Sequence, residues 1–238
     1  MDRLQFLTSV SAAAVASSVA SGSPLPAAIA GVAIPASPFA KEATAIATAG
    51  ESPEIFAHSL RTFLFAELVA KASVIQHDAE AVYVASILHD TGLSVQYMSE
   101  KRRFEVDGAF VALDLCKKHD VAAWKTGLIW DAIALHDQGD IARFKQPEVA
   151  LVNAGVATDF GAHLDILKHP DVAAVLAAAP RDKFVPVFLD AVAAYVKRKP
   201  FATGNSWITD VGYRMVPGFH VDNFVDAVKS DDPFKDYA

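Results

Sequence analysis

The chain has 238 residues, 53% of them hydrophobic, so it is long and apolar enough to bury the core of one large domain. Its formal net charge of −7 argues against a nucleic-acid partner, because phosphate binding needs basic patches. The single cysteine, Cys116, excludes an intrachain disulfide and is predicted to pack as a small apolar side chain.

Residues 1–47 differ in composition from the rest of the chain. They consist mainly of Ala, Ser, Val, Pro and Gly, and Asp2 and Arg3 are the only charges before Lys41. The apolar stretch near the start is shorter and weaker than a membrane-spanning helix, and the small residues 28–30 suit a signal peptidase. We therefore expect a signal peptide-like or disordered low-complexity segment with no stable membrane span. Export to the periplasm or medium is favoured over a cytoplasmic location.

Apolar residues at helical spacing dominate from residue 52 onward. Ser52-Pro53 predicts a helix start, and the periodic pattern carries that helix to Ala72. Further helices are predicted at 79–89, 124–136, 147–159, 168–180 and 183–197. Residues 104–109 lead into another helix, which ends near 119. Strand-like alternation is nearly absent, and the pattern loosens from Lys199. The sequence predicts that residues 48–238 form an all-α bundle with an irregular C-terminal arm.

His89-Asp90 is the most informative dipeptide, because it follows the apolar run 85–88. A carboxylate beside an imidazole behind a buried helical stretch is costly unless something compensates it, and a divalent metal is the strongest compensator. Adjacent residues on a helix point about 100° apart, so both reach one ion only near a helix end. Gly92 predicts that end.

Two further ligand candidates, His58 and Asp159, lie on other predicted helices. Together with His89 and Asp90 they supply two imidazoles and two carboxylates, a set that suits zinc, iron or manganese. Each also has a purely structural interpretation. His58 can be a core histidine bonded to a carbonyl, the His89-Asp90 pair a polar cluster at a helix end, and Asp159 the cap of a turn near Gly161.

Other polar residues are expected to support this centre or to contact a substrate. Arg61 shares a helix face with His58 and is predicted to form a buried ion pair with Glu105. Thr91 belongs to the same supporting group. His136 ends an apolar helix and is expected to face the pocket, with a simple helix-end histidine as the alternative.

The order His, His-Asp, Asp resembles the HD-domain superfamily of metal-dependent hydrolases. Several motifs are similar to its cyanamide hydratase branch: His58-Ser59-x-Arg61, Leu88-His89-Asp90-Thr91-Gly92, Arg103-Phe104-Glu105 through Gly108, Ile133-Ala134-Leu135-His136 and Gly155 through Asp159. The resemblance covers residues 52–194. It implies an all-helical HD-domain bundle, one divalent metal, Zn²⁺ with Fe²⁺ or Mn²⁺ as alternatives, and His58, His89, Asp90 and Asp159 as its ligands.

The branch adds water across the carbon–nitrogen triple bond of cyanamide to give urea. In this interpretation Asp90 binds the metal and steers a proton, and His136 hands a proton to the product. The first hypothesis is therefore a hydro-lyase acting on cyanamide or a similar small nitrile. The alternatives are an HD-domain phosphohydrolase acting on a nucleotide or other phosphate ester, and a non-catalytic exported metal-binding module.

Two features favour the hydratase over the phosphohydrolase. Leu93 stands where phosphohydrolases of the superfamily often carry a basic residue, and no extra histidine pair for a second metal stands between Asp90 and Asp159. The expected partner is a small-molecule substrate, and a homo-oligomer is left open.

Overall fold

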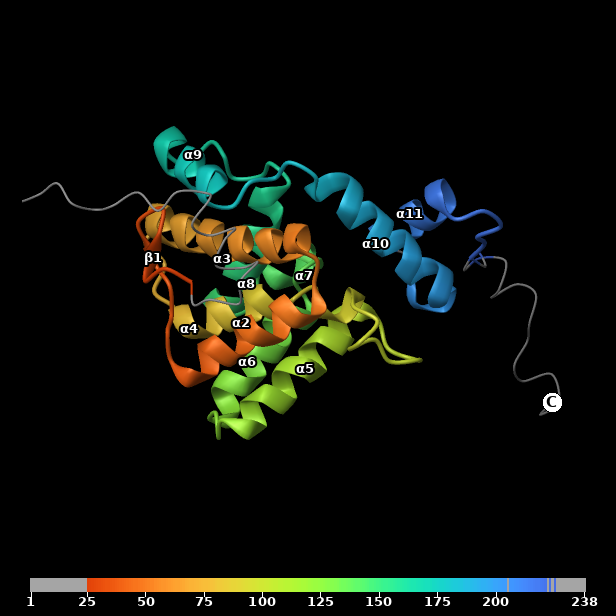
Figure 1. The fold of residues 1–238 in the computed structure, drawn as a ribbon, viewed down its shortest axis with the longest axis horizontal. Helices are drawn as coiled ribbons and strands as arrows, with labels where there is room; N and C mark the ends of the chain where they lie inside the picture. Colours follow the sequence, from red (N-terminus) through yellow and green to blue (C-terminus); the bar gives the residue numbers. More distant parts are fainter. Residues whose placement is uncertain (1–24, 205, 222, 224, 226–238) are drawn as a thin grey trace, which may run out of the picture. The chain divides into compact units, whose positions relative to one another are not determined.

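The computed structural model describes residues 25–204, 206–221, 223 and 225 (Figure 1). Its elements are β1 (Ala28–Ile29), β2 (Val32–Ala33), α2 (Pro38–Gly50), α3 (Pro53–Ser73), α4 (Ala79–Leu88), η1 (Thr91–Leu93), α5 (Phe104–Lys118), α6 (Ala123–Ala134), α7 (Gly139–Ala142), α8 (Pro147–Asp159), α9 (His169–Ala178), α10 (Phe184–Arg198), η2 (Pro200–Ala202) and α11 (Trp207–Met215). The predicted all-α class is confirmed. The chain divides into two compact units, Met1–Phe188 and Leu189–Ala238, and α10 crosses their boundary.

Capping side chains explain where the main helices begin. Ser37 and Ser52 each accept a hydrogen bond from a backbone N–H of the following helix, at Ala40 (3.1 Å) and Ile55 (3.3 Å) respectively. Asp78 accepts two such bonds at the start of α4. Each cap satisfies a donor that the helix itself leaves unpaired, so the predicted start of α3 is confirmed.

Helix α3 is the centre of the larger unit. Its most extensive contact is with α8, and it also packs against α4. Leu60, Phe63 and Leu64 on α3 are fully buried. The two helices lie in close contact at Gly155 of α8, where an added Cβ would lie 2.1 Å from the carbonyl oxygen of Thr62. Glycine at this position therefore sets the spacing between the helices that carry His58 and Asp159.

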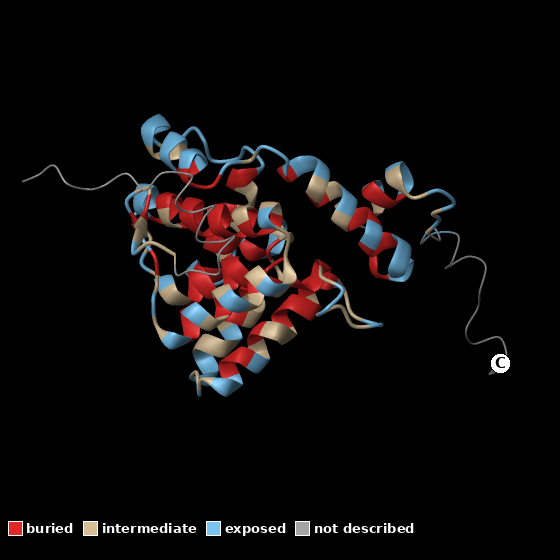
Figure 2. Ribbon diagram, viewed as in Figure 1, coloured by how far each residue is buried: buried red, intermediate tan, exposed pale blue. Residues whose placement is uncertain are grey.

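Helix α4 forms the inner layer of this bundle. It packs against α2, α3, α6 and α8, and its residues from Ala81 to Leu88 are all buried (Figure 2). A helix that is apolar on every side belongs in a core. The burial of α4 places the motif at its C-terminal end inside the protein. On the neighbouring α5, Cys116 is buried as predicted, and burial raises the pKa of its thiol.

Residues 25–47 contribute to the folded unit, so its boundary lies before the predicted one at residue 47. The strands β1 and β2 pair antiparallel, with Ile29 opposite Val32. Helix α2 buries Ala43 and Ala47 and packs against α4. Alanines four apart present a flat face that allows close helix packing, although their abundance resembles low complexity. The segment before residue 25 lies outside the described residues, and export stays a prediction.

The C-terminal arm contains a helix that the sequence analysis did not predict. Helix α11 begins after Ser206, whose hydroxyl accepts a hydrogen bond from Ile208 N (3.3 Å), and it buries Ile208, Val211 and Gly212. This corrects the expectation of a wholly irregular arm. The apolar face was missed because it repeats too few times in nine residues. Among the described helices, none combines the length and apolarity needed to cross a membrane.

Candidate metal centre

The end of α4 brings His89 and Asp90 to the same side. Regular α-helix stops just before His89, and Asp90 has φ −98° and ψ −1° at the start of η1. The hydroxyl of Thr91 donates to the carbonyl of Leu88 (2.7 Å) and stabilises this turn. At Gly92 an added Cβ would lie 1.9 Å from a carbonyl oxygen at the start of α5, so η1 lies directly against α5. The helix end that the dipeptide requires is confirmed.

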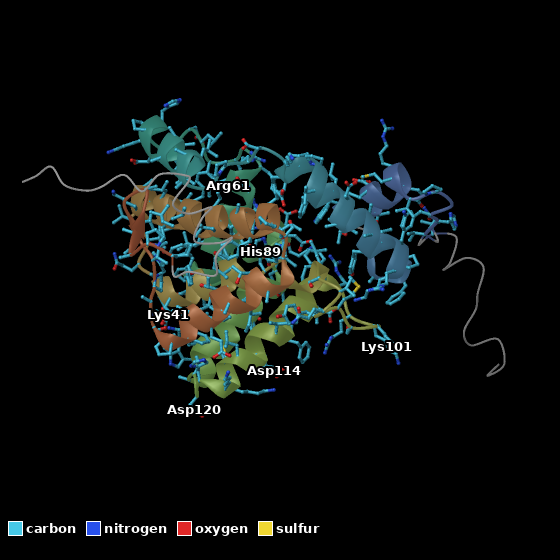
Figure 3. The ribbon with its side chains drawn as sticks, in the orientation of Figure 1. Lys41, Arg61, His89, Lys101, Asp114 and Asp120 are labelled. Atoms are coloured by element: carbon cyan, nitrogen blue, oxygen red, sulfur yellow. The ribbon has the colours of Figure 1, made fainter. Side chains whose placement is uncertain are left out.

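Three of the four predicted ligands meet in the interior. His58 Nε2 lies 3.3 Å from His89 Nε2, and Asp90 Oδ2 lies 3.3 Å from His89 Nε2 and 3.7 Å from His58 Nε2. The three side chains are at most 2% exposed. In Figure 3 His89 and Arg61 are labelled among the helices, whereas Lys101 and Asp120 lie at the edge. One ligand atom from each residue lies within 4.8 Å of the others, a spacing that could hold a metal ion.

The hydrogen bonds around these residues show that the donor set fits a cation. The other ring nitrogens, Nδ1 of His58 and of His89, face the Asp159 carboxylate (2.6 Å) and the Ser86 carbonyl (2.7 Å). Both partners accept hydrogen bonds, so both Nδ1 atoms carry the proton and both Nε2 atoms carry a lone pair. Asp90 Oδ2 is buried and has no hydrogen-bond partner. Three electron-pair donors therefore face one another, an arrangement that a cation stabilises.

The electrostatics of the centre also favour positive charge. Burial by itself would raise the pKa of Asp90, but His89 and the nearby rings of His58 and His136 hold that pKa well below its ordinary value. Burial would lower the pKa of His89, yet Asp90 raises it overall. The ionised Asp90 carboxylate therefore favours positive charge beside the ring nitrogens of the centre. A bound cation would supply this positive charge while the imidazoles stay neutral, the form in which they bind metal.

Asp159 lies behind His58. Its Oδ2 accepts the hydrogen bond from His58 Nδ1, and Arg61 donates from Nε to Oδ1 (2.8 Å) and from Nη2 to Oδ2 (2.9 Å). Burial would raise the pKa of Asp159, but His58 and Arg61 hold it well below its ordinary value. Arg181 Nε lies 3.7 Å from Oδ1. That Asp159 itself contacts the metal stays a prediction.

His136 lies on the other side of Asp90. Its Nδ1–H donates to the carbonyl of Ile133 (2.7 Å), which leaves Nε2 with a lone pair 3.9 Å from Asp90 Oδ1. Its ring meets that of His89 edge-on, with centroids 4.7 Å apart. Burial and His89 lower the pKa of His136 to about 4. The ring is therefore neutral at pH 7, and its Nε2 has a lone pair that can accept a proton.

The predicted ion pair between Arg61 and Glu105 is wrong. Arg61 binds Asp159, while Glu105, at the start of α5, contacts Arg103. Arg103 also lies 3.5 Å from the carboxylate of Asp137. Helical spacing showed which face Arg61 occupies, but it could not show that α8, rather than α5, lies opposite that face.

Replacing Glu105 by glutamine is expected to remove a pH dependence of stability. Burial and the neighbouring Asp137, opposed by Arg103, raise the pKa of Glu105 from 4.5 to about 7. Between these values the folded chain keeps a proton that the unfolded chain has lost, so the stability of the wild type falls as pH rises. The contribution is about 3 kcal/mol, since one pKa unit corresponds to ~1.4 kcal/mol.

Urea unfolding between pH 4.5 and 7.5 measures this difference. The wild type should lose more stability over that range than Glu105→Gln, whereas Glu100→Gln, at an exposed glutamate, should follow the wild type. Parallel curves for Glu105→Gln and the wild type would mean that Glu105 ionises as it does in water.

Two residues near the centre were not singled out from the sequence. The ring of Phe184, at the start of α10, stacks on His58 with centroids 4.6 Å apart and an interplanar angle of 22°. Glu51 accepts a hydrogen bond from Ser59 (3.2 Å), and its Oε1 is buried without a partner. Burial and Asp90 raise the pKa of Glu51 well above its ordinary value. No motif marks either residue: Phe184 lies far from His58 in the chain, and Glu51, eight residues before Ser59, is an isolated acidic residue ahead of α3.

The comparisons with known proteins agree with this geometry. The HD domain matches residues 55–196, which is more than half of the chain and includes every residue of the centre. No curated protein matches the chain.

Proposed function

This chain belongs to the HD domain family, and on that premise we propose that it is a hydratase that adds water to cyanamide or a similar small nitrile. Membership in the family makes it a metal-dependent enzyme of the hydrolase type, and its His58, His89 and Asp90 group can hold the ion. The observation that carries the proposal is the convergence of three buried electron-pair donors, with the lone pair of His136 close by. We further propose zinc as the metal, because two imidazoles and a carboxylate are ligands it commonly takes.

In this proposal Asp90 and His136 have separate roles at the centre. When bound, a divalent cation supplies a Lewis acid that lowers the pKa of water and polarises a substrate atom. Asp90 would hold the cation through Oδ2, and its Oδ1 lies on the side of His136. His136 Nε2 accepts the proton of the attacking water and returns it to the nitrile nitrogen. Oxygen thus adds to carbon and the first proton to nitrogen, which gives the imidic acid, isourea in the case of cyanamide. A second proton transfer from that oxygen to the nitrogen, which His136 Nε2 can also relay, gives the amide form, urea.

The charges near the centre favour a neutral substrate over a phosphate ester. Arg61 and Arg181 both lie against the Asp159 carboxylate. Arg61 is fully buried and also donates hydrogen bonds to two carbonyl oxygens, so its guanidinium is engaged by groups of the protein itself. Leu93, which follows the motif, is buried and carries no charge. A phosphate ester needs cations directed at its oxygens.

The test is an assay of the zinc-loaded protein with cyanamide, scored for urea. The same preparation is given nucleoside triphosphates and a phosphate monoester, scored for released phosphate. Urea formation that disappears with a chelator and returns with zinc supports the proposal. Phosphate release without urea would reverse it in favour of a phosphohydrolase, and metal binding without either product would favour a non-catalytic metal-binding module.

Replacing His136 by glutamine is expected to lower kcat by roughly 10²- to 10⁴-fold, the usual contribution of a general base. Metal content should be unchanged, because His136 Nε2 lies beyond the group of three donors. Elemental analysis and the urea assay on the same sample separate the two effects. His169→Gln, at an exposed histidine, is the matched control and should behave as the wild type. Loss of metal in His136→Gln would instead identify His136 as a ligand.

A further inference from the structure

Both oxygens of Asp159 are already engaged inside the protein. Oδ2 accepts from His58 Nδ1 at 2.6 Å and from Arg61 Nη2 at 2.9 Å, and Oδ1 accepts from Arg61 Nε at 2.8 Å. The three side chains are at most 1% exposed. The carboxylate therefore faces the ring nitrogen of His58 that points away from the other two donors.

Arg61 is held in turn by the backbone. Its Nη1 donates to the carbonyl oxygens of Ala179 (3.2 Å) and Pro180 (3.0 Å), and its guanidinium lies 5.1 Å from the ring centre of Phe184. A buried guanidinium needs its carboxylate partner, because an unpaired charge in the interior is costly. If Asp159 turned toward a cation, it would leave Arg61 without that partner.

We propose that Asp159 is a positioning residue, held by Arg61, that fixes His58 with Nε2 toward the metal, so that this chain binds its ion through His58, His89 and Asp90 alone. An imidazole that donates from Nδ1 to a carboxylate has its tautomer and ring orientation set, and its Nε2 becomes a stronger ligand. Arg61 also connects this arrangement to a second segment of the chain. It joins the centre to residues 179–184, which bring Phe184 onto the His58 ring. The inference rests on the proposed function only in assuming that the centre binds a metal.

The first measurement uses the full-length, metal-free chain. Long-range ¹H–¹⁵N NMR of the histidine rings should show His58 as the Nδ1–H tautomer in the wild type. Asp159→Asn should shift this resonance and weaken the preference, whereas Asp165→Asn, the same change at an exposed position, should not. An Nε2–H tautomer of His58 in the wild type would overturn the inference.

The second measurement replaces the metal by cobalt(II), whose absorption bands report the number of ligands. Asp159→Asn should still bind one cobalt per chain with the wild-type spectrum, at an affinity reduced about 10- to 100-fold, as for other outer partners of metal ligands. Asp90→Asn should bind none at the same concentrations. If Asp159→Asn lost its cobalt as completely as Asp90→Asn, or changed the spectrum, Asp159 would be a ligand and the inference would be wrong.

A double variant guards against misfolding of Asp159→Asn, which leaves Arg61 unpaired. Arg61→Met with Asp159→Asn removes both charges and keeps an apolar side chain of similar length. It should fold and bind cobalt with the wild-type spectrum, and failure to bind would count against the inference. A wild-type chain that binds no cobalt would refute the proposed function, while the His58 tautomer would still decide the role of Asp159.

Discussion

His89→Ala is expected to abolish both metal binding and turnover. His89 Nε2 is 3.3 Å from each of the other two donor atoms, so it links the set. Its removal leaves Asp90 buried without the imidazole beside it and opens a cavity in the interior. Loss of an outer partner of a ligand costs 10- to 100-fold in affinity, so loss of a ligand should cost more than about 100-fold.

Elemental analysis of the purified protein and calorimetric titration with zinc measure this effect. His169→Ala, at an exposed histidine, should keep the wild-type metal content and activity. Far-ultraviolet circular dichroism shows whether the variant keeps its helices, so that a lost site is distinguished from a lost fold. A folded His89→Ala variant with wild-type metal content would place the metal elsewhere and refute the centre described here.

Gly155→Ala is expected to destabilise the fold by about 3 kcal/mol, near the upper end for overpacked positions. The new Cβ would lie 2.1 Å from the carbonyl oxygen of Thr62 and 3.1 Å from the Cβ of Ala66. The nearest of these atoms is backbone, which cannot rotate away, so α3 and α8 have to move apart. His58 and Arg61 are on α3 and Asp159 is on α8, so this separation also lengthens the contacts that orient His58.

Urea unfolding and zinc affinity should therefore decline together in Gly155→Ala. Gly127→Ala is the matched control, because Gly127 is exposed on α6 with no atom within 4 Å of an added Cβ. There the same substitution should raise stability by about 0.5–1 kcal/mol through helix propensity. If Gly155→Ala were as stable as Gly127→Ala, the close approach of α3 and α8 would be refuted.

Local signals were sufficient for the helices and for the core of the motif. Ser52-Pro53, the apolar run before His89 and the glycine at position 92 each act within one or two helical turns, so the sequence shows them directly. The errors arose where a partner lies far away in the chain. Arg61 was assigned to Glu105, and the packing of α2 was hidden by an alanine-rich composition.

The sequence by itself determined which residues form the candidate centre: two histidines, an adjacent aspartate at a helix end, and an apolar pattern that buries them. Only the tertiary structure decided what each side chain faces. His58 has two ring nitrogens, and the sequence cannot say which one meets Asp159 and which one meets His89. That choice depends on how closely α3 and α8 approach at Gly155 and on the carboxylate that Arg61 holds. Helical periodicity defines the face of each helix, whereas the partner of that face is set by packing between segments about 100 residues apart.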